Sequence, residues 1–181
     1  MASYYYLISS LPDLRTDGDM PFSYKEFLGM CQSNVSESKY EFLSNLTLSS
    51  DEGPLLKDWA VFYNNLMSEL NAQRSANLGR AYLKSYDKDS VLSQVVGTVL
   101  AAKNPLEAEK ILLDYEFENL DSLVGLHTFD DVYLFGYAVK LKTAGAPETV
   151  LYRKKAKKNS NVFLIRCSSA FISYRRNTHL C

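Results

Sequence analysis

Few side chains in this 181-residue chain have the types and spacing that catalysis or metal binding requires. Its two histidines, His127 and His179, lie far apart in the sequence. His127 comes just before an expected helix cap, where a loop residue is more common than a catalytic acid or base. His179 and Cys181 form a single spaced pair, which is fewer ligands than a zinc site needs. The sequence therefore predicts no catalytic histidine and no metal site.

The acidic pairs and the first cysteine also have structural explanations. Asp130 and Asp131, like Glu107 and Glu109, stand at expected helix starts, where a carboxylate interacts favourably with the helix dipole. Cys31 falls on the apolar face of an expected helix, which favours a buried, inert thiol. The sequence contains no phosphate-binding loop, dinucleotide fingerprint or nucleophile elbow. We therefore expect a protein that is not an enzyme, with no catalytic residue and no cofactor.

Charge is distributed unevenly along the chain, although the formal net charge is only −1. Residues 1–152 contain 12 Lys and Arg against 21 Asp and Glu, whereas residues 153–181 contain eight basic residues and no acid. These basic residues are Arg153, Lys154, Lys155, Lys157, Lys158, Arg166, Arg175 and Arg176. A basic segment with aromatic neighbours can bind nucleic acid through its phosphates, but the acidic remainder of the chain opposes this. Nucleic acid is therefore an alternative partner, not the expected one.

The character of the sequence also changes after about residue 158. The apolar runs Val162–Ile165 and Ala170–Tyr174 are strand-like and fit no helical face. Because element type and charge pattern change together, a truncated or frame-shifted reading is one explanation of the basic tail 153–181. A native tail that is solvated or contacts a partner is the other.

The composition is typical of a globular protein, with 46% hydrophobic and 23% charged residues. No run approaches the roughly 18 apolar residues of a membrane-spanning helix. The first residues lack the basic start and long apolar core of a secretory signal. Three widely spaced cysteines, Cys31, Cys167 and Cys181, indicate reduced thiols and hence a cytoplasmic location.

Helix signals dominate the chain from residue 23 onward. Ser23 and Glu26 have the spacing of a capping box. Residues 3–9 are rich in Tyr, and we expect them to form a short extended segment that ends before Pro12. A first helical turn is the alternative. The helices are expected from Ser23, over 37–48, over 54–76, over 88–102, from Asn104, over 128–144 and from Pro147.

Three helix starts can be predicted from single residues. Pro54 is preset for the first position of the longest helix. Asn104 is expected to cap the helix that follows it. Thr128 is expected to cap the next helix, with Asp130 and Asp131 in its first turn.

Apolar periodicity predicts an all-α fold. Leu55, Trp59, Phe62, Leu66 and Leu70 recur at helical spacing on the longest helix, so they predict one buried face with Trp59 as a core anchor. The succession of amphipathic helices with short connections favours an antiparallel helical bundle or a pair of stacked bundles. We expect one helical domain over residues 1–152. The alternative is a pair of small lobes with a break near 79–88.

Three segments resemble an uncharacterised bacterial family whose genes lie among those of V-type ATPase subunits. They are Tyr5–Pro12, Phe22-Ser23 together with Glu26-Phe27-Leu28, and Asn104–Glu109, and the resemblance covers about residues 3–152. That family is similar in its all-helical layout to the C (or d) subunit of V/A-type ATPases. The resemblance implies a non-catalytic coupling protein, in which a rigid helical body joins the membrane rotor ring to the central shaft.

The expected partners are therefore other V-type ATPase subunits, namely the rotor ring and the central shaft. The expected location is cytoplasmic, at the inner face of the membrane and attached through those partners. A general helical protein-interaction adaptor is the first alternative, and nucleic-acid binding through the basic tail is the second. Members of the family continue with further helices, whereas this chain turns basic and strand-like after residue 158.

Overall fold

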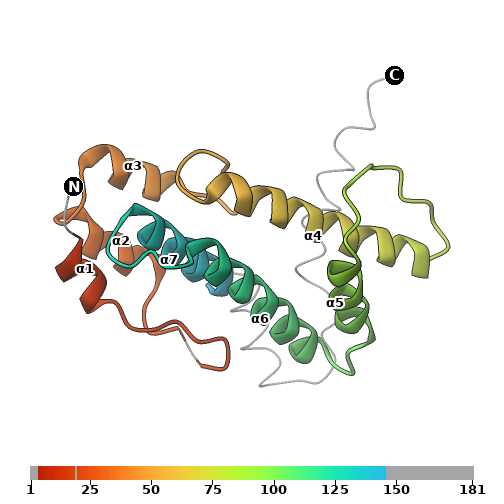
Figure 1. Cartoon of the computed structure of the whole chain (residues 1–181). Helices are drawn as coiled ribbons and strands as arrows, with labels where there is room; N and C mark the ends of the chain where they lie inside the picture. Colours follow the sequence, from red (N-terminus) through yellow and green to blue (C-terminus); the bar gives the residue numbers. More distant parts are fainter. Residues whose placement is uncertain (1–3, 19, 146–181) are drawn as a thin grey trace.

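The computed structural model describes residues 4–18 and 20–145, which form helices joined by loops (Figure 1). Its elements are α1 (Tyr5–Ser10), α2 (Tyr24–Gln32), α3 (Glu37–Asn45), α4 (Leu56–Asn77), α5 (Ser90–Ala101), α6 (Pro105–Val124) and α7 (Asp131–Ala144). No strand occurs in these two ranges, so the predicted all-α fold class is confirmed for them. The helix expected from Pro147 and the basic tail 153–181 lie outside the described residues.

The start of the chain corrects one prediction, because residues 5–10 form helix α1 and not an extended segment. The amide of Ile8 donates to the carbonyl of Tyr4 at 2.8 Å, which closes a helical turn. Tyr4, Leu7 and Ile8 are all buried, and their spacing of three and four residues fits one helix face. In a strand, Leu7 and Ile8 would point to opposite sides. Burial of one face thus outweighs the strand preference of tyrosine.

Two helix starts follow the sequence closely. The Ser23 hydroxyl accepts from the Glu26 amide, and the Glu26 carboxylate accepts from the Ser23 amide at 2.7 Å, so the capping box is present. The Asn104 side chain accepts from the amide of Glu107 at 2.9 Å and caps α6. Both caps satisfy amides that have no partner within the helix.

Two other starts differ from the prediction. Helix α4 begins at Leu56 because Leu55 adopts a left-handed backbone with φ of 55°, which leaves Pro54 outside the helix. Helix α7 is capped by Asp130 and not by Thr128, since the Asp130 carboxylate accepts from the Tyr133 amide at 3.1 Å. A carboxylate at the cap position both bonds the amide and complements the helix dipole.

Helices α4 and α6 connect two hydrophobic clusters. The first cluster contains Trp59 from α4 and Phe117 from α6, together with residues of α1, α2, α3 and α7. The second contains Leu66 and Leu70 from α4, Leu112 from α6, and residues of α5. The boundary between the two clusters therefore falls within α4 and α6. A division into lobes stays a prediction.

Helix α7 lies at the centre of the first cluster and is buried from residue 134 to residue 139. It packs beside α6, to which a short connection joins it (Figure 1). A Cβ atom on Gly136 would lie 2.4 Å from Cγ2 of Val124, so only glycine permits this approach. The first turn of α7 lies close to α3 and to the segment before α1, because Lys39 of α3 contacts both Asp131 and Tyr4.

Candidate functional site

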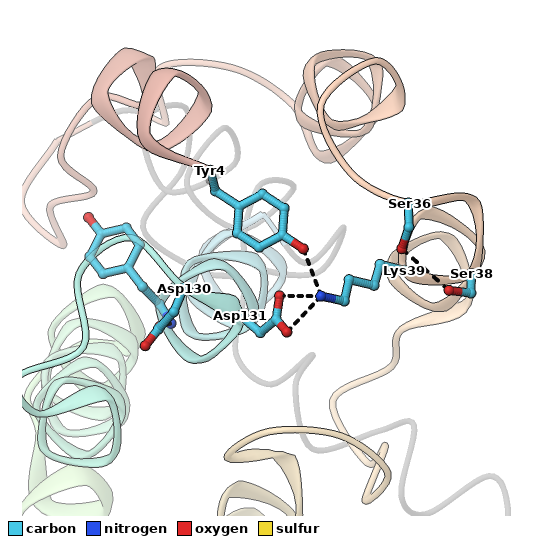
Figure 2. Close-up of polar contacts among 7 residues, drawn as sticks. Tyr4, Ser36, Ser38, Lys39, Asp130 and Asp131 are labelled. Carbon is cyan, nitrogen blue, oxygen red and sulfur yellow. Dashed lines mark hydrogen bonds and ion pairs between the residues drawn. The ribbon is translucent and has the colours of Figure 1, made fainter. Parts of the chain in front are cut away.

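A polar contact joins three elements at this end of the bundle (Figure 2). The ammonium of Lys39 on α3 donates to the Tyr4 hydroxyl at 2.7 Å. It also donates to both carboxylate oxygens of Asp131 at 2.7 Å. Tyr4 precedes α1, and Asp131 begins α7. The contact therefore fastens the N-terminal segment and α3 to the central helix.

The electrostatics of this contact favour a structural role. Hydrogen bonds from Lys39 to Asp131 and then to Tyr4 raise the pKa of the lysine. Burial chiefly raises the pKa of Tyr4. Lys39 therefore stays protonated at neutral pH and cannot act as a base. The side chains of Lys39 and Asp131 are about one-third exposed, so water screens the pair.

A depression of about 220 Å³ lies beside the same contact. Its lining residues are Ser38, Lys39, Phe42, Gly53, Pro54, Asp131 and Phe135. A lysine ammonium has three hydrogens, and the bonds to Tyr4 and to the two Asp131 oxygens already use them. The depression thus offers a ligand mainly apolar contacts.

His127 lies in the loop before α7, as the sequence predicts. Its Nδ1 atom pairs with Oδ2 of Asp130, while Oδ1 of the same carboxylate caps the helix. Burial raises the pKa of Asp130, but hydrogen bonds from His127 and from the Tyr133 amide outweigh burial and lower it. Asp130 is therefore charged at neutral pH, and the pair braces the first turn of α7.

Cys31 is fully buried in the first cluster, as its position on the apolar face of α2 predicts. Burial raises the pKa of its thiol to about 12. At neutral pH the thiol is protonated and a poor nucleophile. Cys167, His179 and Cys181 lie outside the described residues.

One buried polar group was not anticipated from the sequence. Glu69 on α4 is only 4% exposed, and its Oε1 atom accepts from Gln73 at 2.7 Å and from the Ser93 hydroxyl at 2.8 Å. Burial raises the pKa of Glu69, but hydrogen bonds from Gln73, Tyr86 and Ser93 outweigh burial and lower it. The Glu–Gln spacing of four was visible in the sequence, whereas the contact with α5 was not.

A second depression, of about 440 Å³, lies between the segment after α1 and the face of α6. Its charged lining residues are Arg15, Asp17, Lys110, Asp114, Glu118 and Asp121. Acids outnumber bases among them, and Arg15 already pairs with Asp17 at 3.0 Å. We call this feature the acidic depression.

Exposed aromatic rings form a patch near the start of α1. Tyr5 contacts Phe129 with a ring-centroid distance of 4.8 Å and Tyr6 with a distance of 5.7 Å. Tyr6 is 83% exposed, and Tyr5 and Phe129 are each about half exposed. We call these three residues the aromatic patch. Its rings contribute little to the core, so it is available for contact.

Comparison of the chain with protein-family models, with curated proteins and with solved structures gave no match. Within residues 4–18 and 20–145, no helix has the length and apolar character to cross a membrane. The same residues bring no three His, Cys, Asp or Glu side chains together as metal ligands.

Proposed function

We propose that this protein is a non-catalytic accessory or central-stalk subunit of a bacterial V-type ATPase, similar in role to the C (d) subunit. In this role it would connect the central shaft to the membrane rotor ring and lie at the cytoplasmic face of the membrane, attached through its partners. The sequence support for this proposal comes from the three segments that resemble the family encoded among V-type ATPase genes.

The structural observation that supports this proposal is that helices α4 and α6 both extend through the two hydrophobic clusters. Helix α4 has 22 residues and helix α6 has 20, so they are about 33 and 30 Å long. Neither is interrupted between the two clusters. Close-packed helices of this kind resist deformation. A coupling subunit needs such a body, because it must transmit a force between two partners without bending.

The resembling segment Tyr5–Pro12 has both structural and exposed residues. The Ser10 hydroxyl donates to the Leu7 carbonyl at 2.6 Å, and the Tyr137 hydroxyl donates to the Pro12 carbonyl at 2.8 Å. The first bond lies within α1, and the second anchors the segment to α7. Tyr5 and Tyr6 instead face outward. Exposed aromatic residues are common at protein interfaces, which supports a protein partner.

Co-purification tests this proposal directly. The full chain, carrying an affinity tag, is co-expressed with the V-type ATPase subunits of its source bacterium. We expect rotor-ring or central-shaft subunits to remain bound through size-exclusion chromatography. A tagged helical protein of similar size and charge is the control. If no ATPase subunit is retained above this control, the proposal is wrong.

A general protein-interaction adaptor is the second candidate, because the aromatic patch does not by itself specify an ATPase. The same experiment separates the two functions. An adaptor would form a defined complex with a protein that is not an ATPase subunit, and the ATPase subunits would elute separately.

A further inference from the structure

Leu55 has a backbone conformation that a leucine rarely adopts. Its φ is 55° and its ψ is −17°, and among the residues that the structure describes it is the one non-glycine residue with a positive φ. The amide of Leu56 donates to the carbonyl of Pro54 at 2.7 Å, so Leu55 is the central residue of a tight turn. A positive φ strains this residue, because its Cβ atom crowds a backbone carbonyl. The surrounding structure must therefore hold the turn in place.

The turn at Leu55 determines where the residues before α4 lie. The ψ angle of Leu55 is close to the helical range, and its carbonyl accepts from the Trp59 amide at 3.0 Å. The chain after Leu55 therefore continues as a helix, whereas the positive φ turns Pro54 and Gly53 away from the helix axis. Gly53 then lies against α3, since a Cβ atom on it would be 3.4 Å from the ring of Phe42.

Gly53 and Pro54 belong to the lining of the depression of about 220 Å³ beside Lys39. The same lining contains Phe42 from α3 and Phe135 from α7, whose ring centroids are 5.3 Å apart. We call Gly53 and Pro54 the strap. A change in the course of the strap would therefore reshape the depression and alter the exposure of the two rings.

The local sequence favours a second start for α4. Proline is preset for the first helical position, glycine is tolerated at the cap before it, and the acids Asp51 and Glu52 complement the helix dipole. With a helical φ of about −63° at Leu55, the helix would gain Pro54 and Leu55. The backbone strain would disappear, but the strap would lose its contact with Phe42. The two starts thus differ by a few opposing local interactions, so both are accessible to one chain.

We propose that Leu55 is a hinge about which the strap closes and opens the depression. In the closed form, which the structure shows, Leu55 is left-handed and the strap contacts Phe42. In the open form, α4 begins at Pro54 and the strap moves away from α3, which exposes the rings of Phe42 and Phe135. The inference goes beyond the proposed function and does not depend on any ATPase subunit.

Two substitutions of Leu55 separate the two forms. Leu55→Gly and Leu55→Ala both remove the isobutyl group, but glycine accommodates a positive φ whereas alanine favours the right-handed helix. In the open form the Lys57 amide can donate to the Gly53 carbonyl, and the Asp58 amide can donate to the Pro54 carbonyl. In the closed form neither amide has an acceptor within the helix, because both belong to its first turn. Hydrogen exchange at these two amides of the full chain, followed by NMR, should be about tenfold slower in Leu55→Ala than in Leu55→Gly. Equal exchange in the two variants would overturn the inference.

The contact between the strap and α3 provides a second readout. The closed form brings Gly53 close to the Phe42 ring, so a nuclear Overhauser effect between their protons is expected in the wild-type chain and in Leu55→Gly. It should be lost in Leu55→Ala. Leu83→Ala and Leu83→Gly are the matched control pair, because Leu83 is 89% exposed in the α4–α5 connection (Figure 1). Both controls should keep the contact, and a contact that persists in Leu55→Ala would refute the hinge.

Relaxation dispersion on the wild-type chain tests the hinge with every side chain in place. A minor open form that exchanges in microseconds to milliseconds should broaden the amide signals of Gly53, Leu55 and Asp58 with one common rate constant. Leu55→Gly should abolish this broadening, because glycine removes the strain of the closed form. Circular dichroism checks that each variant is folded, and the wild-type measurement decides if one is not. Flat profiles at all three wild-type amides, or rate constants that differ among them, would show that the strap does not open.

Discussion

Lys39 and Asp131 lie 92 residues apart in the sequence, yet the lysine ammonium bonds both oxygens of the carboxylate at 2.7 Å. The pair connects α3 to the first turn of α7, and Tyr4 adds the N-terminal segment. Because the pair is partly exposed, it specifies how these elements meet more than it stabilises them.

A double-mutant cycle should show this modest coupling. Lys39→Met and Asp131→Asn each remove one partner, and the coupling between them should be about 0.5–1 kcal/mol. Urea unfolding of the four proteins measures it. The coupling should fall in high salt, because exposed charges are screened. A coupling that salt does not change would mean that the pair is shielded from water.

Gly136 should tolerate no side chain. Gly136→Ala places a Cβ atom 2.4 Å from Val124 and should destabilise the protein by about 1–3 kcal/mol. Gly29→Ala in α2 is the matched control, since its Cβ would meet nothing within 4 Å. This control should stabilise the protein by about 0.5–1 kcal/mol through helix propensity. Thermal unfolding compares the two, and equal effects would contradict the close approach of α6 and α7.

Glu69 should make stability depend on acidic pH. Its pKa is lower in the folded chain than its ordinary value of 4.5, so its contribution is complete above that value. The contribution is lost as pH falls through the folded-state pKa. Glu69→Gln should flatten the decrease in unfolding free energy between about pH 5 and pH 3. Urea unfolding across this range measures it, and an unchanged decrease would show that Glu69 is not its source.

The Cys31 thiol should be unreactive until the chain unfolds. It is fully buried, and its pKa is raised to about 12. Iodoacetamide labelling at neutral pH, followed by mass spectrometry of the Cys31 peptide, should find modification only in denaturant. Leu83→Cys provides an exposed thiol as the positive control. Rapid labelling of Cys31 in buffer would mean that the first cluster opens locally.

Local signals predicted much of the fold. The Ser23 capping box and the Asn104 cap depend on residues three positions apart, so the sequence alone contains them. The burial of Trp59 follows from helical periodicity. Helix α1 was missed because strand propensity and helical spacing conflict in a short tyrosine-rich segment, and tertiary burial decides between them.

The polar contacts between elements could not be predicted in the same way. Lys39 and Asp131 are ordinary charged residues until the bundle brings them together. Glu69 and Gln73 are visible as a pair on one helix, but Ser93 completes the contact from α5. The aromatic patch likewise requires Tyr5 and Phe129, which belong to opposite ends of the described chain. Such pairings depend on topology, which periodicity does not encode.

The uninterrupted course of α4 also makes it a lever. Trp59 is held in the first cluster, and Asn77 lies 18 residues further along the same helix, or about 27 Å away. A tilt of about 5° around Trp59 would therefore shift the far tip by about 2 Å, given the axial rise of a helix. A small tilt of α4 at one end of the molecule would thus produce a larger displacement at the other end.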